Sequence, residues 1–125
     1  MDGPTPSWTI ISISEDSDWP SAEDPCTIEL GPGWRLPTST EWTNADSNVS
    51  WVDRDGVYAS VLKLHAAGSL FPTTGALNYR GSDGFWWSST QNSSTDGDYL
   101  YSGLFVSSVY DFNKASGYSG RCIKD

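Results

Sequence analysis

The sequence predicts one compact, irregular β-rich domain that carries at least one short helix. Its 125 residues suffice for a single hydrophobic core but not for two. Aromatic residues make up 14% of the chain, with seven Trp, and many lie between Gly, Ser and Pro, a pattern typical of short strands and turns rather than of a helical bundle. We expect a disordered or cloning-derived N-terminus over residues 1–7 and the domain over residues 8–125.

The first half of the chain predicts a strand, a loop and a helix in that order. Residues 8–14 alternate imperfectly with β-branched side chains and predict the first strand, which we expect to pair with the end of the chain. The acidic stretch 15–25 lacks the ligand spacing of a calcium loop, so we expect solvated charge there. Thr38 and Glu41 form a capping box that predicts a short helix from about Ser39 to near Asp46. Arg35, just before it, is expected to meet a carboxylate or carbonyl partner.

The second half predicts a polar loop followed mainly by strands. Residues 49–56 are expected to form the loop, with Trp51 on it, and residues 57–62 a short helix or strand. After a turn at residues 72–75, Trp86 and Trp87 fall on opposite sides of a strand, because successive side chains of a strand alternate. Two further strands are expected to draw their apolar residues from Leu100, Leu104 or Phe105, Val106, Val109 and Phe112.

The charge of the chain excludes two classes of partner. A net charge of −9 and a pI near 4.2 would repel a nucleic-acid backbone and an anionic membrane at long range. No stretch has the apolar length of a membrane span, so we expect no direct membrane insertion. The first residues lack the basic and apolar regions of a signal peptide, so for an exported domain we expect the export signal or anchor to lie outside this sequence.

The two cysteines are far apart in sequence. Cys26 and Cys122 fit neither a redox CxxC pair nor a zinc site, which need near neighbours. We expect one disulfide that closes most of the domain, stabilises it by about 4 to 5 kcal/mol and implies an oxidising compartment. Two buried free thiols in a cytosolic protein remain the alternative.

The residues give little support for catalysis. His65 is the only histidine, and no serine or cysteine lies in a recognisable nucleophile elbow. A lone histidine in an apolar segment is more typical of a structural residue. We therefore expect no enzyme, no catalytic residue, no bound metal and no cofactor.

Several motifs in order carry a resemblance to a known family. The segments DPC, GWRLPTSTEW, LKLHAAG, RGSDGFWWSST and KASGYSGRCIKD resemble the Fibrobacter succinogenes major paralogous domain family, FISUMP, over about residues 24–125. The resemblance implies an α+β, C-type-lectin-like domain related to the formylglycine-generating enzymes, with short helices around a small twisted antiparallel sheet and long irregular loops. It also implies a secreted or surface-exposed bacterial protein. One departure is that TIELGP separates Cys26 from Gly33, where the family has its cysteine almost directly before the glycine.

A narrower resemblance concerns the last third of the chain. TSTEW, LKLHAAG, WSSTQ and GYSGRC are similar to the variable proteins of diversity-generating retroelements in gut Bacteroidales and their phages. This resemblance implies a fixed frame that includes Trp87, Leu100, Tyr118 and Cys122, with exchangeable positions between the frame residues. The exchangeable positions, which would form the ligand surface, are Phe85, Trp86, Asn92, Ser94, Asp96, Asp98, Tyr101, Gly103, Phe105, Tyr110, Phe112 and Ser116.

The resulting expectation is a receptor-recognition or adhesin-like module that displays a variable surface to a protein or carbohydrate ligand on a cell surface. Its location would be extracellular, on a cell surface or on a phage particle. One alternative is a structural domain of a surface or fimbrial protein without a dedicated ligand. A remote alternative is an oxidase of the formylglycine-generating type, which would require a nearby pair of free cysteines.

Overall fold

The computed structural model of the protein describes residues 17–48 and 51–125. In chain order its elements are α1 (Pro25–Leu30), β1 (Trp34–Arg35), α2 (Ser39–Asn48), α3 (Arg54–Ala59), β2 (Ser69–Leu70), β3 (Leu77–Asn78), β4 (Gly84–Gln91), β5 (Asp96–Ser102), β6 (Ser107–Asn113) and β7 (Ile123–Lys124). The predicted strand over residues 8–14 and the predicted N-terminus over residues 1–7 lie outside the described residues.

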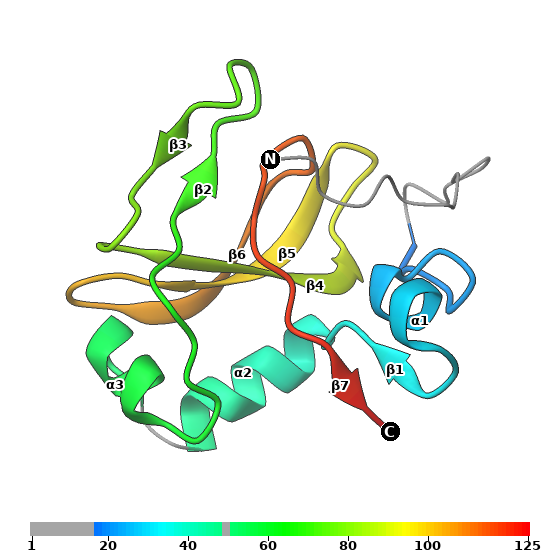
Figure 1. Ribbon diagram of the computed structural model, residues 1–125, viewed down its shortest axis with the longest axis horizontal. Helices are drawn as coiled ribbons and strands as arrows, with labels where there is room; N and C mark the ends of the chain where they lie inside the picture. Colours follow the sequence, from blue (N-terminus) through cyan, green and yellow to red (C-terminus); the bar gives the residue numbers. More distant parts are fainter. Residues whose placement is uncertain (1–16, 49–50) are drawn as a thin grey trace.

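A three-stranded antiparallel sheet in the order β4–β5–β6 occupies the centre of the molecule. Helices α2 and α3 lie on one side of it, and the β2–β3 hairpin rises from the other side (Figure 1). The short antiparallel pair β1–β7 brings the end of the chain back beside α1. The described residues therefore form a mixed α+β domain of short helices and small antiparallel sheets, with no barrel among them, which confirms the predicted class.

The strand register decides which side chains face the helices. Trp86 lies opposite Leu100, and Leu100 lies opposite Val109, so these three share the face toward α2 and α3. Trp87 and its neighbours in register point to the other side. The prediction that Trp86 and Trp87 fall on opposite sides of their strand is confirmed.

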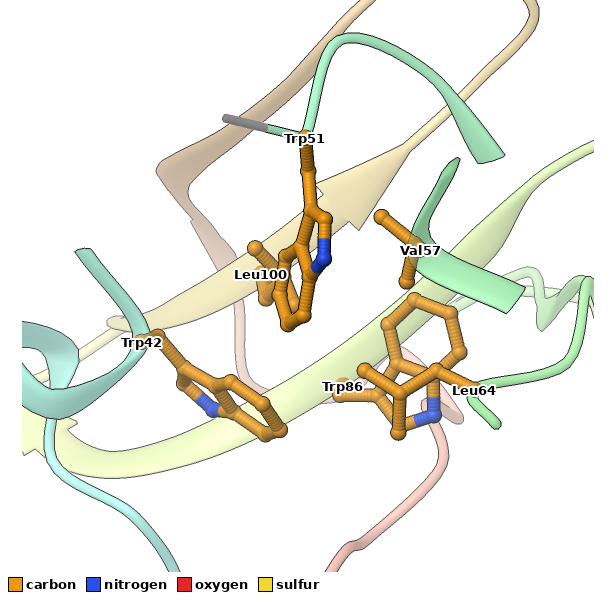
Figure 2. Close-up of a cluster of buried hydrophobic side chains, with 6 residues drawn as sticks. All are labelled: Trp42, Trp51, Val57, Leu64, Trp86 and Leu100. Carbon is orange, nitrogen blue, oxygen red and sulfur yellow. The ribbon is translucent and has the colours of Figure 1, made fainter. Parts of the chain in front are cut away.

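The hydrophobic core fills the space between the sheet and the helices. Figure 2 shows its six buried side chains converging from the helices, the sheet and the loops between them: Trp42, Trp51, Val57, Leu64, Trp86 and Leu100. The indole of Trp42 also donates a hydrogen bond to the carbonyl oxygen of Trp87, at 3.3 Å. Trp51 is 7% exposed, so it belongs to the core although it lies on the predicted loop, of which residues 51–53 remain outside any helix or strand. Its large apolar surface outweighs the polarity of its neighbours.

The predicted capping box begins α2. The Glu41 carboxylate accepts a hydrogen bond from the Thr38 N–H at 2.8 Å, and the Thr38 hydroxyl accepts one from the Glu41 N–H at 3.2 Å. Both Glu41 oxygens also receive hydrogen bonds from the Arg35 guanidinium at 2.8 Å, and Arg35 Nε pairs with Asp125 at 2.9 Å. Arg35 thus joins the start of α2 to the end of the chain.

Asp24 corrects the expectation that the acidic stretch is solvated. Its side chain is buried, at 2% exposed, and accepts hydrogen bonds from the N–H groups of Cys26 at 2.8 Å and Leu36 at 2.9 Å. It also caps α1 from the position before Pro25, where the first N–H groups of a helix lack partners. One carboxylate therefore holds both α1 and the chain that leads to α2.

The disulfide joins Cys26 of α1 to Cys122, across 96 residues of sequence. The predicted bridge is confirmed, and the alternative of two free thiols is wrong. It closes nearly the whole described chain. On the chain-entropy view a loop of this length contributes about 4 to 5 kcal/mol to stability.

Two segments differ from their predicted form. The short helix or strand expected over residues 57–62 is the helix α3, which begins earlier, at Arg54, because Asp53 caps it by accepting a hydrogen bond from the Gly56 N–H at 2.9 Å. Residues 104–106, expected in strands, form the β5–β6 turn and are exposed. Three consecutive apolar residues are typical of a strand interior, but here the turn exposes them to solvent.

We predict that Asp24→Ala lowers the free energy of unfolding by about 3 kcal/mol, because it leaves buried N–H groups without an acceptor. Denaturant unfolding followed by circular dichroism measures the change. Asp55→Ala is the control, because the Asp55 side chain is 84% exposed and its loss is expected to cost less than about 0.5 kcal/mol. Equal effects of the two substitutions would contradict the role of Asp24.

We predict that Glu41→Gln costs about 1 kcal/mol at pH 7, a modest value because solvent screens a side chain that is 40% exposed. The hydrogen bonds from Arg35 lower the pKa of Glu41 from 4.5 to about 2. A lowered pKa contributes stability that is present above pH 4.5 and is lost as the pH falls toward 2. The gap between the two proteins should therefore close over this range in urea unfolding at a series of pH values, and a gap that stays constant would refute the pairing.

Candidate functional site

Large rings cover the face of the sheet that points away from the helices. We call this the aromatic face, and its six rings are those of Phe85, Trp87, Tyr99, Tyr101, Tyr110 and Phe112. Register places them in cross-strand rows: Trp87, Tyr99 and Tyr110 form one row, and Phe85 lies opposite Tyr101 in the next. Cross-strand neighbours on one face lie close enough for rings to contact. The ring centroids of Phe85 and Tyr101 are 5.3 Å apart.

Tyr118, from the segment that precedes β7, packs across the centre of the aromatic face. Its ring centroid lies 5.0 Å from Phe85, 4.5 Å from Trp87 and 4.7 Å from Tyr99. The chain reaches this position because Gly117 pairs with Leu70 of β2. A Cβ atom at position 117 would lie 2.7 Å from the Leu70 Cβ, so only glycine permits this approach without a shift.

A hollow of about 190 Å³ opens between the β2–β3 hairpin and the aromatic face. We call it the hairpin hollow. Phe85 and Tyr99 in the sheet are 8% and 9% exposed, and Phe71 and Tyr79 come from the hairpin side. Phe112 and Tyr118 complete the set of six rings around it. Residues from three distant parts of the chain therefore enclose one ring-lined depression.

Three tyrosine hydroxyls of this region, those of Tyr99, Tyr101 and Tyr118, have raised pKa values. Burial raises the pKa of the Tyr99 hydroxyl above its ordinary range, and the neighbouring Tyr118 adds to the effect. Burial also raises the pKa of Tyr118, and it raises that of Tyr101, where the charge of Asp83 adds to it. At neutral pH these hydroxyls are neutral hydrogen-bonding groups rather than nucleophilic phenolates.

The structure gathers some of the twelve predicted ligand positions on this surface. Tyr101, Tyr110 and Phe112 lie on the aromatic face, and Tyr110 and Phe112 are each 46% exposed. Phe85 and Ser116 are buried but line the hairpin hollow. These five predicted positions lie close together in the structure.

Other predicted positions lie elsewhere. Trp86 is 4% exposed and belongs to the core, so its assignment to the ligand surface is wrong. Gly103 is buried at the β5–β6 turn, and a Cβ there would lie 2.2 Å from the Tyr101 hydroxyl oxygen, so a side chain would have to displace that ring. Asp96 and Asp98 share the strand side of Leu100, toward the helices. Burial raises the pKa of Asp98.

The remaining three positions are exposed but belong to turns. Asn92 and Ser94 lie between β4 and β5, and Phe105, which is 87% exposed, lies between β5 and β6. Neither turn contributes a residue to the lining of the hairpin hollow. Exposure alone therefore does not place a residue in the candidate site.

Sequence reasoning missed the hairpin. Leu70, Phe71 and Tyr79 are 45%, 48% and 60% exposed beside the hollow. None of them is among the predicted ligand positions, which begin at Phe85. Their signal in the sequence is the turn at residues 72–75 with large apolar residues on both sides, which predicts a hairpin. Nothing in the local sequence shows that this hairpin stands over the sheet.

A second hollow, of about 290 Å³, shares Tyr118 with the hairpin hollow and is otherwise lined by residues such as Trp19, Leu36 and Trp87. None of the twelve predicted positions lines it, so the hairpin hollow carries the candidate site. Within residues 17–48 and 51–125, no group of three or more His, Cys, Asp or Glu side chains is placed to hold a metal ion. In the same ranges no helix is long and apolar enough to cross a membrane.

No family model matches the chain, and neither does any curated protein or solved structure.

We predict that the two faces of the sheet differ sharply in their tolerance of substitution. Trp86→Ala should lower the free energy of unfolding by about 3 to 5 kcal/mol, because it leaves a cavity in the core. Tyr110→Ala, with nearly half of its side chain in solvent, should cost less than about 1 kcal/mol. Thermal and denaturant unfolding of both variants measure the difference, and equal costs would contradict the assignment of the faces.

Proposed function

We propose that this domain is a ligand-binding module whose binding surface is the aromatic face together with the hairpin hollow. The observation that carries the proposal is the combination of a ring-lined hollow with half-exposed rings beside it, on a sheet whose other face is the core. Concave sites lined by aromatic side chains with a few polar groups are typical of binding sites. Tyrosine is enriched where binding energy concentrates.

The proposal includes the family context that the motifs indicate. The domain would be a C-type-lectin-like member of the FISUMP family, diversified by a retroelement, and located outside the cell, on its surface or on a phage particle. The disulfide supports an oxidising compartment. It also argues against the oxidase alternative, since both cysteines are joined to each other and provide no free pair.

The structure limits which positions can vary within this proposal. Exchange at Tyr101, Tyr110 and Phe112 would alter the surface and leave the core intact, whereas exchange at Trp86 would break the core. Sister copies of the gene should therefore vary at the first three positions and keep a large apolar residue at position 86. A near-copy template beside a reverse transcriptase gene would support the retroelement origin.

We predict that replacing Tyr101, Tyr110 and Phe112 together by Ser weakens the binding of every ligand by at least about tenfold, because it removes three rings through which the surface would contact a ligand. Ligands are first found by probing the full chain against a glycan array and a display library of bacterial surface proteins. The affinities of these ligands for the unaltered chain and for the triple variant are then measured by biolayer interferometry.

The matched control replaces Leu30, Val52 and Val61 together by Ser. These residues are 53%, 66% and 94% exposed and lie outside the aromatic face. Ligands that bind the Tyr101, Tyr110 and Phe112 variant as well as the unaltered chain would place the site elsewhere. A complete absence of ligands in both screens would favour the structural alternative.

A further inference from the structure

We infer that the hairpin hollow is a socket for one apolar side chain that projects from a positively charged protein ligand. This inference rests on the proposed binding function and specifies the ligand of the same surface. It follows from the size of the hollow, the chemistry of its lining, the character of its rim and the charge of the domain.

The size of the hollow limits its occupant. Its volume is about 190 Å³, whereas pockets for drug-sized ligands span roughly 300 to 1,000 Å³. A single leucine- or phenylalanine-sized group fits such a space, and a chain of several rings does not. The occupant is therefore one group that projects from a larger body.

The lining favours an apolar group over a sugar ring. None of the described residues that line the hollow is charged, and none carries a side-chain amide. Its polar groups are hydroxyls, from Ser69 and Ser116 and from the tyrosines. A saccharide would bring many hydroxyls out of water into a site with few strong partners, and unpaired polar groups are costly when buried. An aliphatic or aromatic side chain makes no hydrogen bonds to water, so its burial carries no such cost.

The rim indicates that the larger body is a protein. Four residues that line the hollow, Leu70, Phe71, Tyr79 and Phe112, are 45% to 60% exposed. Tyr110, which is 46% exposed, lies beside them, with its ring centroid 6.4 Å from that of Tyr99. A small ligand inside the hollow would leave these side chains in water. Contiguous exposed apolar patches with a polar surround mark protein interaction sites, and a protein surface covers the rim and fills the hollow at once.

The charge of the domain selects among protein partners. Two copies of this chain would each bring a net charge of −9 and would repel each other, so a second copy is disfavoured. A partner of net positive charge is attracted at long range and associates faster. The occupant is therefore a side chain on the surface of a different, basic protein.

The first experiment uses single side chains as probes. The full chain, labelled with 13C in its aromatic rings, is titrated in two-dimensional NMR with N-acetyl-L-leucinamide and N-acetyl-L-phenylalaninamide. N-acetyl-L-glutaminamide and methyl α-D-glucopyranoside are the polar comparison. The apolar probes should shift the ring signals of Phe85, Tyr99 and Phe112 with a Kd of about 1 mM, as expected for ligands of this size. The polar probes should leave these signals unchanged.

Two variants locate the binding. Ser116 is 5% exposed and lines the hollow. Ser116→Leu should therefore fill the hollow and lower the affinity for the apolar probes by at least about tenfold. Phe105→Ser alters a side chain that is 87% exposed and lies outside the hollow, so binding should be unchanged. If circular dichroism shows that Ser116→Leu is unfolded, Phe71→Ala replaces it, with roughly 3- to 10-fold weaker binding expected.

The charge of the partner is tested with two pentapeptides that place leucine between lysines or between glutamates. The lysine peptide should bind about tenfold more tightly at low salt, and added salt should reduce the difference. Equal affinities would overturn the charge assignment. Shifts of the ring signals by the glucopyranoside as large as those caused by the leucine probe would assign the hollow to sugars instead.

The failure of this inference is distinguishable from that of the proposed function. Apolar probes that do not bind, or that bind Ser116→Leu unchanged, overturn the socket. If ligands from the screens still depend on Tyr101, Tyr110 and Phe112, the binding function stands without it. If no ligand depends on those residues either, both proposals fail.

Discussion

The alternation of side chains along β4, β5 and β6 is the constraint on which the rest of the structure depends. Trp86, Leu100 and Val109 occupy one face in register, and burying them against α2, α3 and Trp51 supplies the core. Since a shift of one residue would send every side chain of a strand to the opposite face, this burial also fixes the outward position of Tyr99, Tyr101 and Tyr110. The aromatic face is thus a consequence of the core.

The aromatic face is supported from outside the sheet as well. Tyr118 contacts Phe85, Trp87 and Tyr99, and the disulfide and the Arg35 ion pairs hold the chain end that carries it. Burial raises the pKa of the Tyr99 and Tyr118 hydroxyls. A surface that is held at its centre and half exposed at its edge suits recognition, because its rings lose little conformational freedom when a ligand covers them.

Features that depend on neighbouring residues or on the cysteine positions could be predicted from the sequence. The spacing of Thr38 and Glu41 predicted the start of α2, and the spacing of the cysteines predicted the disulfide. Asp24 could not be predicted, since its role depends on the Leu36 N–H twelve residues away. The sequence does not reveal the strand register, and the register places Trp86 and Asp98 on the face toward the helices, away from the aromatic face. The hairpin contribution of Phe71 and Tyr79 depends on tertiary packing that no local pattern encodes.

The central claim is that one face of the sheet determines folding and the other is free to change. The most direct measurement compares two display libraries of the full chain under protease challenge. One library randomises positions 101, 110 and 112, and the other randomises positions 86, 100 and 109. Our account predicts that most members of the first library resist the protease and that very few of the second do. Equal resistant fractions, or a larger fraction in the second library, would contradict it.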